Sequence, residues 1–320
     1  MQATRARLDA VAPSLFPSFF LAGFECATPI NWHGQRIDPL AATEHDRRVR
    51  EDYRALQRLG IRAVREGARW NRIDRDGRYD FRPLRPFVEA AQEAGLTVIW
   101  DLFHYGYPDG ADPFSETFVH RFADYCHAVA RYIDRHTSGT PFYTPINEIS
   151  YFAWAAGDAG VFAPHARGRS FELKINLVRA ALAGIEAIRD VNPRARMVNA
   201  DPICKVVAPL DRPDLEERAR WYSQHVVYEA WDMLAGRQLP ELGGSRERLD
   251  IVGVNYYWTN QWEHQRPGQY LCPDDPRLTM LSDLLCDVAE RYGGDLLITE
   301  TAHVGPLRAP SGTPSLRLAP

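Results

Sequence analysis

Short apolar segments of five to eight residues recur along the chain and alternate with longer segments of helical periodicity. Seven of the short segments are rich in β-branched and aromatic residues and predict β-strands. They are Phe19–Phe24, Ile61–Arg65, Thr97–Phe103, Phe142–Glu148, Arg196–Asp201, Asp250–Tyr257 and Asp295–Glu300. Because the runs are nearly continuously apolar, we expect these strands to be buried on both faces.

The segments between the predicted strands place apolar side chains three and four residues apart, which is typical of one face of an α-helix. These predicted helices are Val49–Leu59, Leu84–Ala94, Phe118–Ile133, Leu177–Ile188, Trp221–Leu234 and Leu278–Tyr292. Gly95 follows the second of them, where a glycine is a common helix stop.

Alternating strands and helices predict βαβ units and a parallel sheet, hence the α/β class. Seven strands favour a (β/α)8 TIM barrel over a doubly wound sheet, which remains the alternative. A doubly wound domain usually carries a Gly-rich phosphate loop after its first strand. Here the first predicted strand continues as E-C-A-T-P from Glu25, which is no such loop.

The twenty residues after Glu300 are too few for an eighth strand and helix. We therefore predict a TIM barrel that lacks its eighth βα unit, as one catalytic domain over residues 1–305. Residues 306–320 are rich in Pro, Ser and Arg and predict a disordered tail. Without the eighth unit, the first and seventh strands would have unpaired edges, which invite association with other chains.

The composition narrows the class of function. Hydrophobic residues make up 45% of the chain and charged residues 25%, as in ordinary soluble proteins. The net charge of −4 predicts no attraction to nucleic acid or to an anionic membrane. No segment is long and apolar enough to span a membrane. The five cysteines have no C-x-x-C spacing, which favours reduced thiols, a cytoplasmic location and no metal site.

Polar side chains gather where the predicted strands end, which in a barrel is the face that carries catalytic residues. Carboxylates end the fourth and seventh strands, at Glu148 and Glu300. The ends of the other strands supply Glu25, Arg65, Asp101, His104, Asn199, Asp201, Asn255 and Tyr257. Two carboxyl groups on opposite sides of a barrel mouth are what glycoside hydrolysis requires.

The motifs at these strand ends resemble clan A of the glycoside hydrolases, and most closely family 1, the β-glucosidase and β-galactosidase group. In chain order they are F-L-A-G-F, R-x-x-x-x-W-x-R-I from Arg65, D-L-F-H-Y-G-Y-P from Asp101, T-P-I-N-E, D-I-V-G-V-N-Y-Y and L-I-T-E. The resemblance runs from about Phe19 to Gly305.

The resemblance implies a role for each matching residue. Glu148 would be the general acid/base and Glu300 the nucleophile that forms a covalent glycosyl-enzyme. Asn147 would hydrogen-bond the sugar 2-hydroxyl, and His104 would bind another sugar hydroxyl. Arg65 and Tyr257 would contact the nucleophile, and Asn255 lies on the same rim. Without the resemblance, Arg65 reads as an ordinary ion-pair partner, His104 as a core histidine and Asn255 as a turn cap.

The chain also departs from the family pattern. The glutamine that family members carry after the first strand is missing, and Glu25 and Asn31 are the candidate replacements. Ile149 follows the acid/base where the family has proline, and T-A-H follows Glu300 where it has N-G. These changes indicate a divergent branch.

We therefore predict a retaining β-glycosidase that acts on small glycosides without metal or organic cofactor, and that binds neither nucleic acid nor a membrane. Two alternatives remain open. One is a catalytically impaired remnant that binds sugar or only carries the fold. The other is a transglycosylase that uses the same two glutamates. The sequence leaves the oligomeric state open.

Overall fold

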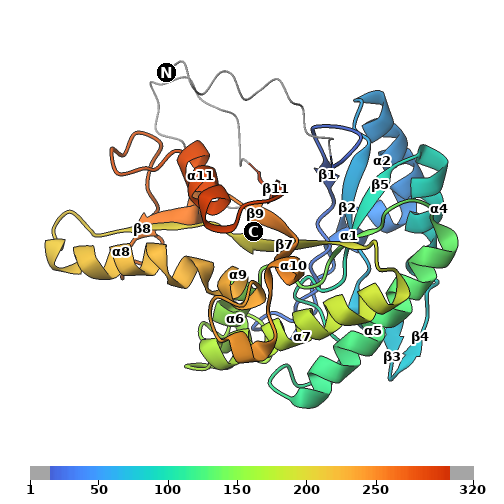
Figure 1. The fold of residues 1–320 in the computed structure, drawn as a ribbon, viewed down its shortest axis with the longest axis horizontal. Coiled ribbons are helices and arrows are strands. Elements are labelled where there is room, and N and C mark those ends of the chain that lie inside the picture. The colour runs from blue at the N-terminus through green and yellow to red at the C-terminus, as the bar shows by residue number, and fades with distance from the viewer. Residues whose placement is uncertain (1–14, 303–320) are drawn as a thin grey trace. The chain divides into compact units, whose positions relative to one another are not determined.

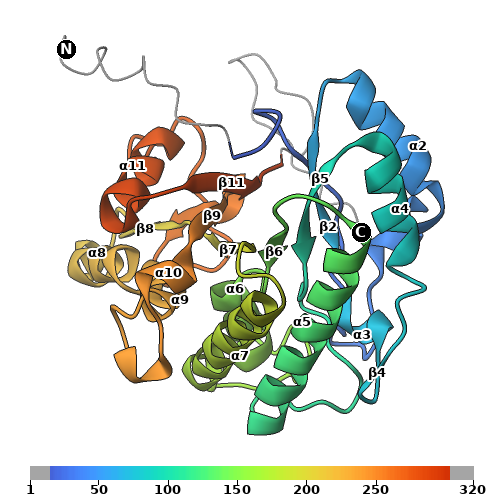
Figure 2. The same ribbon diagram turned by 45° about the vertical axis from the view of Figure 1, so that its right-hand side comes forward.

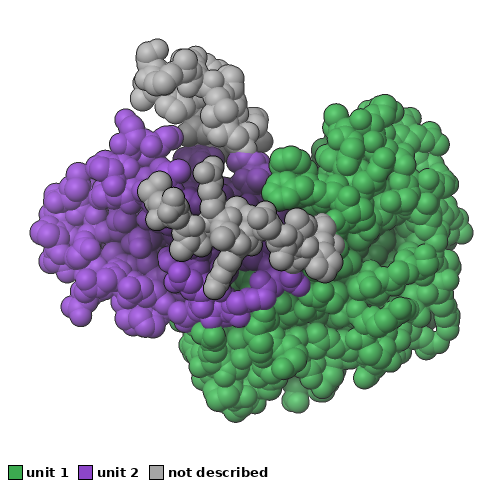
Figure 3. Space-filling view, turned by 45° about the horizontal axis from the view of Figure 1, so that its top comes forward, with its two compact units in different colours: residues 1–201, 229–252 green, residues 202–228, 253–320 purple. Residues whose placement is uncertain are grey.

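The computed structural model describes residues 15–302, which form two compact units. Unit 1 contains the residues up to Asp201 together with Glu229–Val252. Unit 2 contains Pro202–Tyr228 and the residues from Gly253 onward, and Figure 3 colours the two units separately. The tail predicted over residues 306–320 lies outside the described residues.

Seven strands form one sheet, in the order β1-β2-β5-β6-β7-β9-β11 (Figure 1). Their bounds are β1 Ala22–Gly23, β2 Ala63–Gly67, β5 Thr97–Asp101, β6 Phe142–Thr144, β7 Arg196–Pro202, β9 Ile251–Asn255 and β11 Leu296–Glu300. Each falls within or beside one of the seven predicted segments. The strand order follows the chain order without reversal, whereas a doubly wound sheet reverses at a switch point. The doubly wound alternative is therefore wrong.

The register of the inner strands brings their carboxyl ends to one level. β2, β5 and β6 pair in parallel, so that Gly67 lies opposite Asp101 and Asp101 opposite Thr144. All residues of β2 and β6 are buried. Side chains that follow these three strands consequently start from neighbouring points of the sheet.

The helices of unit 1 connect its strands. They are α1 Pro39–Ala42, α2 His45–Arg58, α3 Trp70–Ile73, α4 Arg85–Ala94, α5 Glu116–His136, α6 Ile149–Gly157, α7 Ser170–Val191, α9 Glu229–Leu234 and α10 Arg246–Leu249, with the 3-10 turn η4 Pro240–Leu242. The two longest, α5 and α7, pack side by side (Figures 1 and 2). Gly184 permits this approach, because a Cβ there would lie 2.9 Å from the Cys126 sulfur and 3.1 Å from the Phe122 ring. Gly95 ends α4 in the left-handed conformation, as predicted.

Unit 2 has a small core of its own. The strands β8 Lys205–Val207 and β10 Gln261–Glu263 pair in parallel. Val206, Leu215 and Ala219 are buried together, and Trp262 packs against them. The remaining elements are η2 Pro213–Leu215, α8 Glu216–Gln224, η3 Val226–Tyr228, η5 Trp258–Asn260 and α11 Leu281–Tyr292.

Two sequence predictions need correction, and one further element was missed. The first strand is only two residues long, and Phe19 and Phe20 beside it are exposed. The helix predicted over Trp221–Leu234 is broken into α8, η3 and α9, with a turn at His225. The hairpin of β3 Asp74–Arg75 and β4 Arg78–Tyr79 was not predicted, because its strands are too short to show a period.

The five cysteines are all free. Across residues 15–302, the helices are too short or too polar to cross a lipid bilayer.

Candidate active site

Glu148 follows β6 and is the residue before the first turn of α6. Its backbone is left-handed, at φ 50° and ψ 59°, and its N–H donates to the carbonyl of Ala200 on β7 at 2.8 Å. The side chain is buried. A non-glycine residue in this conformation is strained and persists only where its surroundings fix it. The ends of two neighbouring strands thus hold this carboxyl in place.

The Tyr105 hydroxyl donates a hydrogen bond to Oε2 of Glu148. Tyr105 is itself left-handed, at φ 62°, so two strained residues meet at this point. The phenol ring is buried and stacks on Phe152 of α6 at 5.7 Å between centroids. Tyr105 was not among the site residues predicted from the sequence. Its signal was its place directly after His104 in the F-H-Y-G-Y-P motif.

Four buried side chains form a closed ring of hydrogen bonds beside Glu148. Arg65 Nη2 donates to Asp101 Oδ2 at 2.6 Å and to Asn147 Oδ1 at 2.7 Å. His104 Nδ1 lies 2.9 Å from the same Asp101 oxygen, and its Nε2 lies 3.1 Å from Asn147 Nδ2. Breaking a buried ion pair by removing one partner typically costs about 3–5 kcal/mol, because a charge is left uncompensated. We refer to Arg65, Asp101, Asn147 and His104 as the strand-end ring.

Cys26, Asp101 and His104 bring three potential metal-binding atoms within 4.8 Å of one another. Burial raises the pKa of the Cys26 thiol to about 12, whereas metals bind the thiolate. The nearby Asp101 oxygen is engaged by the Arg65 guanidinium, whose positive charge would also oppose a cation. The donors therefore fit a metal poorly, and we assign them to hydrogen bonding.

Burial and neighbouring groups shift the pKa of His104 in opposite directions. Burial lowers its pKa, whereas the neighbouring Cys26 and Asp101 raise it above its ordinary value. Asn147 acts against protonation, because an amide NH2 donates only to an unprotonated Nε2. The His104 side chain is buried and hydrogen-bonded, as expected of a core histidine, and both of its partners, Asp101 and Asn147, belong to the same site. Sugar binding by His104 stays a prediction.

The other strand-end residues of unit 1 differ in whether they lie beside the strand-end ring. Glu25 is exposed, and its Oε1 lies 3.8 Å from His104 Nε2, beside the ring. Asn199 donates to the carbonyl of Arg248 instead. Asp201 Oδ1 accepts from the Ser150 N–H at 3.0 Å, in the first turn of α6, and burial raises the pKa of Asp201 to about 6.

Three further predicted residues lie together in unit 2. The Tyr257 hydroxyl donates to Glu300 Oε2 at 2.8 Å, and the backbone N–H of Tyr256 donates to the Glu300 carbonyl at 3.0 Å. Asn255 is fully buried and accepts from the Thr299 hydroxyl at 2.6 Å. We therefore interpret Asn255 as a link between β9 and β11 rather than as a turn cap. Tyr257 and Glu300 are both half-buried.

The predicted site residues therefore form two groups, one in each unit. Arg65, His104, Asn147 and Glu148 belong to unit 1, with Glu25 beside them, and Asn255, Tyr257 and Glu300 belong to unit 2. Two tryptophans of unit 1 differ in exposure. Trp70 is buried core, whereas Trp154 on α6 is 51% exposed.

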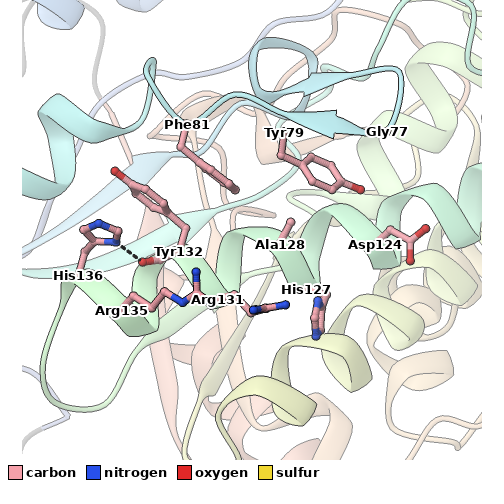
Figure 4. Close-up of a pocket in the computed structure, with 10 residues that line it drawn as sticks. All are labelled: Gly77, Tyr79, Phe81, Asp124, His127, Ala128, Arg131, Tyr132, Arg135 and His136. Atoms are coloured by element: carbon pink, nitrogen blue, oxygen red, sulfur yellow. Dashed lines mark hydrogen bonds between the residues drawn. The ribbon is translucent and has the colours of Figure 1, made fainter.

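A surface hollow of about 620 Å³ lies between β4 and α5 in unit 1 (Figure 4). Its aromatic rings already pack on one another, with Phe81 on Tyr132 at 4.4 Å and Tyr132 on His136 at 4.2 Å. The predicted site residues are not part of its lining. We therefore do not assign the reaction to this hollow.

Residues 26–233 match the sequence pattern of glycosyl hydrolase family 1. The chain belongs to this family. The family 1 match includes Arg65, His104, Asn147 and Glu148, and it ends before Asn255, Tyr257 and Glu300. No curated protein was found to match the chain.

Solved structures of a family 1 enzyme share the fold. The β-glucosidase from Thermotoga maritima in complex with noeuromycin is 20% identical, with a TM-score of 0.63, over 80% of this chain and 66% of that chain. The same enzyme in complex with glucoimidazole gives a TM-score of 0.69 over 89% of this chain and 78% of that chain. In the first comparison, this chain thus spans just under two thirds of the enzyme's length. The fold is that of a (β/α)8 TIM barrel, of which the described residues supply seven strands.

Proposed function

We propose that this chain is a retaining β-glycosidase that hydrolyses small glycosides by double displacement. Glu148 protonates the leaving oxygen while Glu300 attacks the anomeric carbon, and Glu148 then deprotonates water to release the sugar. Retention predicts that the two carboxyl groups approach to ~5–5.5 Å in the working enzyme. A cytoplasmic location, with the free cysteines reduced, belongs to the same proposal.

Family membership supports the reaction class, and one observation carries the assignment of roles. Glu148 is a buried carboxyl at the end of a barrel strand, fixed by Tyr105 and preceded by Asn147, which lies in the strand-end ring. Barrel enzymes place catalytic residues at this end of the strands. Glu300 ends another strand and accepts a hydrogen bond from Tyr257.

The direct test is covalent labelling of the purified protein. A dinitrophenyl 2-deoxy-2-fluoro-β-glycoside should leave its sugar on Glu300. The fluorine slows both formation and hydrolysis of the glycosyl-enzyme, whereas the good leaving group speeds formation alone, so the intermediate accumulates. Peptide mass spectrometry locates the label, and Glu300→Gln should abolish both the label and the hydrolysis of nitrophenyl β-glycosides. A label on another carboxylate would overturn the assignment.

The second candidate is a protein that binds glycosides without turnover. The half-exposed state of β11 favours this candidate. Glu300 ends this strand, and as a nucleophile it would need a fixed and partly desolvated position. Folded wild-type protein that binds sugars in calorimetry, yet hydrolyses none of a nitrophenyl glycoside panel, would support this candidate over the first.

A further inference from the structure

Asp101 is a buried carboxylate that neither the reaction nor the family roles above employ. Its side chain is fully buried, and its Oδ2 accepts from Arg65 and lies within hydrogen-bond distance of His104. The other oxygen, Oδ1, has no hydrogen-bond partner among the described residues. A buried charge that is only partly satisfied costs stability, so its retention points to a task at this position.

The Cys26 sulfur lies 3.9 Å from Asp101 Oδ2, but the two nearer partners of this oxygen, Arg65 and His104, are the side chains that also contact Asn147. Arg65 Nη2 reaches Asp101 and Asn147 at once, at 2.6 and 2.7 Å. His104 uses Nδ1 toward Asp101 and Nε2 toward Asn147. Each partner is thereby anchored on one side by the carboxylate and on the other side by the amide.

These contacts select one of the two orientations of the Asn147 amide. Its oxygen must face the guanidinium, which can only donate, and its NH2 then faces the His104 side. An amide rotated by 180° would place NH2 against Arg65 and lose both contacts. Since Asp101 fixes the positions of Arg65 and His104, it controls the amide from across the ring.

We propose that Asp101 is a positioning residue that sets the orientation of the Asn147 amide, and through it the recognition of the substrate's 2-hydroxyl group. The inference rests on the proposed function, because it takes the 2-hydroxyl as the group that Asn147 binds. Asp101 touches no reacting atom in this account and acts only through Arg65, His104 and Asn147.

The test compares two substrates in the full chain: an aryl β-glycoside and its 2-deoxy analogue, which lacks the hydroxyl in question. Asp101→Asn should lower kcat/KM about 10- to 100-fold for the glycoside, the range for a hydrogen bond in a charged setting. It should leave kcat/KM for the 2-deoxy analogue nearly unchanged. An equal loss on both substrates would overturn the inference and leave the proposed function standing.

A matched control lies in the same unit. Asp74 is also a fully buried carboxylate paired with an arginine, Arg121, at 2.7 Å, and it contacts neither Glu148 nor the ring. Asp74→Asn should lower thermal stability without changing the ratio of the two kcat/KM values. If Asp101→Asn does not fold, Asp101→Glu keeps the charge and displaces it by one methylene, so the same ratio should fall by a smaller factor.

An inactive wild-type protein would overturn the proposed function separately. The same two glycosides are then compared by binding calorimetry. A wild-type preference for the glycoside that disappears in Asp101→Asn would support the role of Asp101. Equal binding of the two glycosides by the wild type would overturn it.

Discussion

Glu148 is buried at the end of an inner strand and surrounded by buried polar side chains, whereas Glu300 is half-buried on β11, at one end of the strand order. Both carboxylates accept a hydrogen bond from a tyrosine hydroxyl, from Tyr105 and Tyr257 respectively. Burial is therefore the main difference between them. The proposed acid/base is thus the more desolvated carboxyl of the two, and the proposed nucleophile is the more exposed one.

The comparison also shows why the two halves of the proposed mechanism are unequally supported. The family match over residues 26–233 includes Glu148 and three residues of its surroundings, but not Glu300. The assignment of Glu300 depends on the local L-I-T-E motif and on its contact with Tyr257. Experiments that separate the two carboxylates are accordingly the most informative.

The largest expected effect distinguishes the acid from the nucleophile. Glu148→Gln should lower kcat/KM by about 10²–10⁴-fold for alkyl glycosides, whose leaving groups require protonation. The loss should be much smaller for dinitrophenyl glycosides, which depart without a proton. Glu300→Gln should abolish turnover of both kinds. Steady-state kinetics on the two substrate classes measures this, and a Glu148→Gln loss independent of the leaving group would contradict the division of roles.

A second prediction concerns Asp201, a buried carboxyl on β7 next to Ala200, whose carbonyl accepts from the Glu148 N–H. The folded pKa of Asp201, about 6, lies above the ordinary value of 3.8. The stabilising effect of its neutral form is therefore complete below pH 3.8 and lost as the pH rises through 6. Asp201→Asn should remove this loss, raising the unfolding free energy relative to wild type by up to about 3 kcal/mol at pH 8.

Urea unfolding of both proteins at pH 5 and pH 8 tests this prediction. The difference between variant and wild type should be larger at pH 8, and the other titrating groups largely cancel. A difference that is equal at the two pH values would show that Asp201 is already ionised at pH 5.

The smallest effect compares the two tyrosines. Tyr105→Phe and Tyr257→Phe each remove one hydroxyl that donates to a carboxylate, a bond worth about 1.5–3 kcal/mol when the acceptor is charged. Water can replace the lost donor more easily beside the half-buried Glu300. We therefore expect the larger drop in kcat for Tyr105→Phe. A larger drop in kcat for Tyr257→Phe would contradict this expectation, because water would then replace the lost hydroxyl more easily beside the buried Glu148.

Part of the sheet could be predicted because inner strands are buried on both faces and therefore appear in the sequence as nearly continuous apolar runs. β5 is the clearest case, with Val98, Ile99 and Trp100 all buried. The strands β8 and β10 were not predicted, because each is three residues long and their pairing joins segments far apart in the sequence. The break in the helix at His225 was also hidden, since apolar spacing continues across it.

The candidate site was predictable to the extent that its residues stand at strand ends within family-like motifs. Asp101 was identified there but received no role, because a single sequence does not reveal which side chain a carboxylate faces. Its pairing with Arg65 follows from the register of β2 and β5, in which Gly67 lies opposite Asp101. Tyr105 was overlooked because its place after His104 in an aromatic-rich motif does not reveal that its hydroxyl faces Glu148.

The left-handed backbone at Glu148 has a consequence for laboratory evolution. Glycine adopts this conformation without the steric cost of about 1–3 kcal/mol that a side chain incurs. A library screened only for heat resistance would therefore enrich glycine at position 148 and lose catalysis. Stability and turnover compete at this residue, so a screen must require both to keep the glutamate.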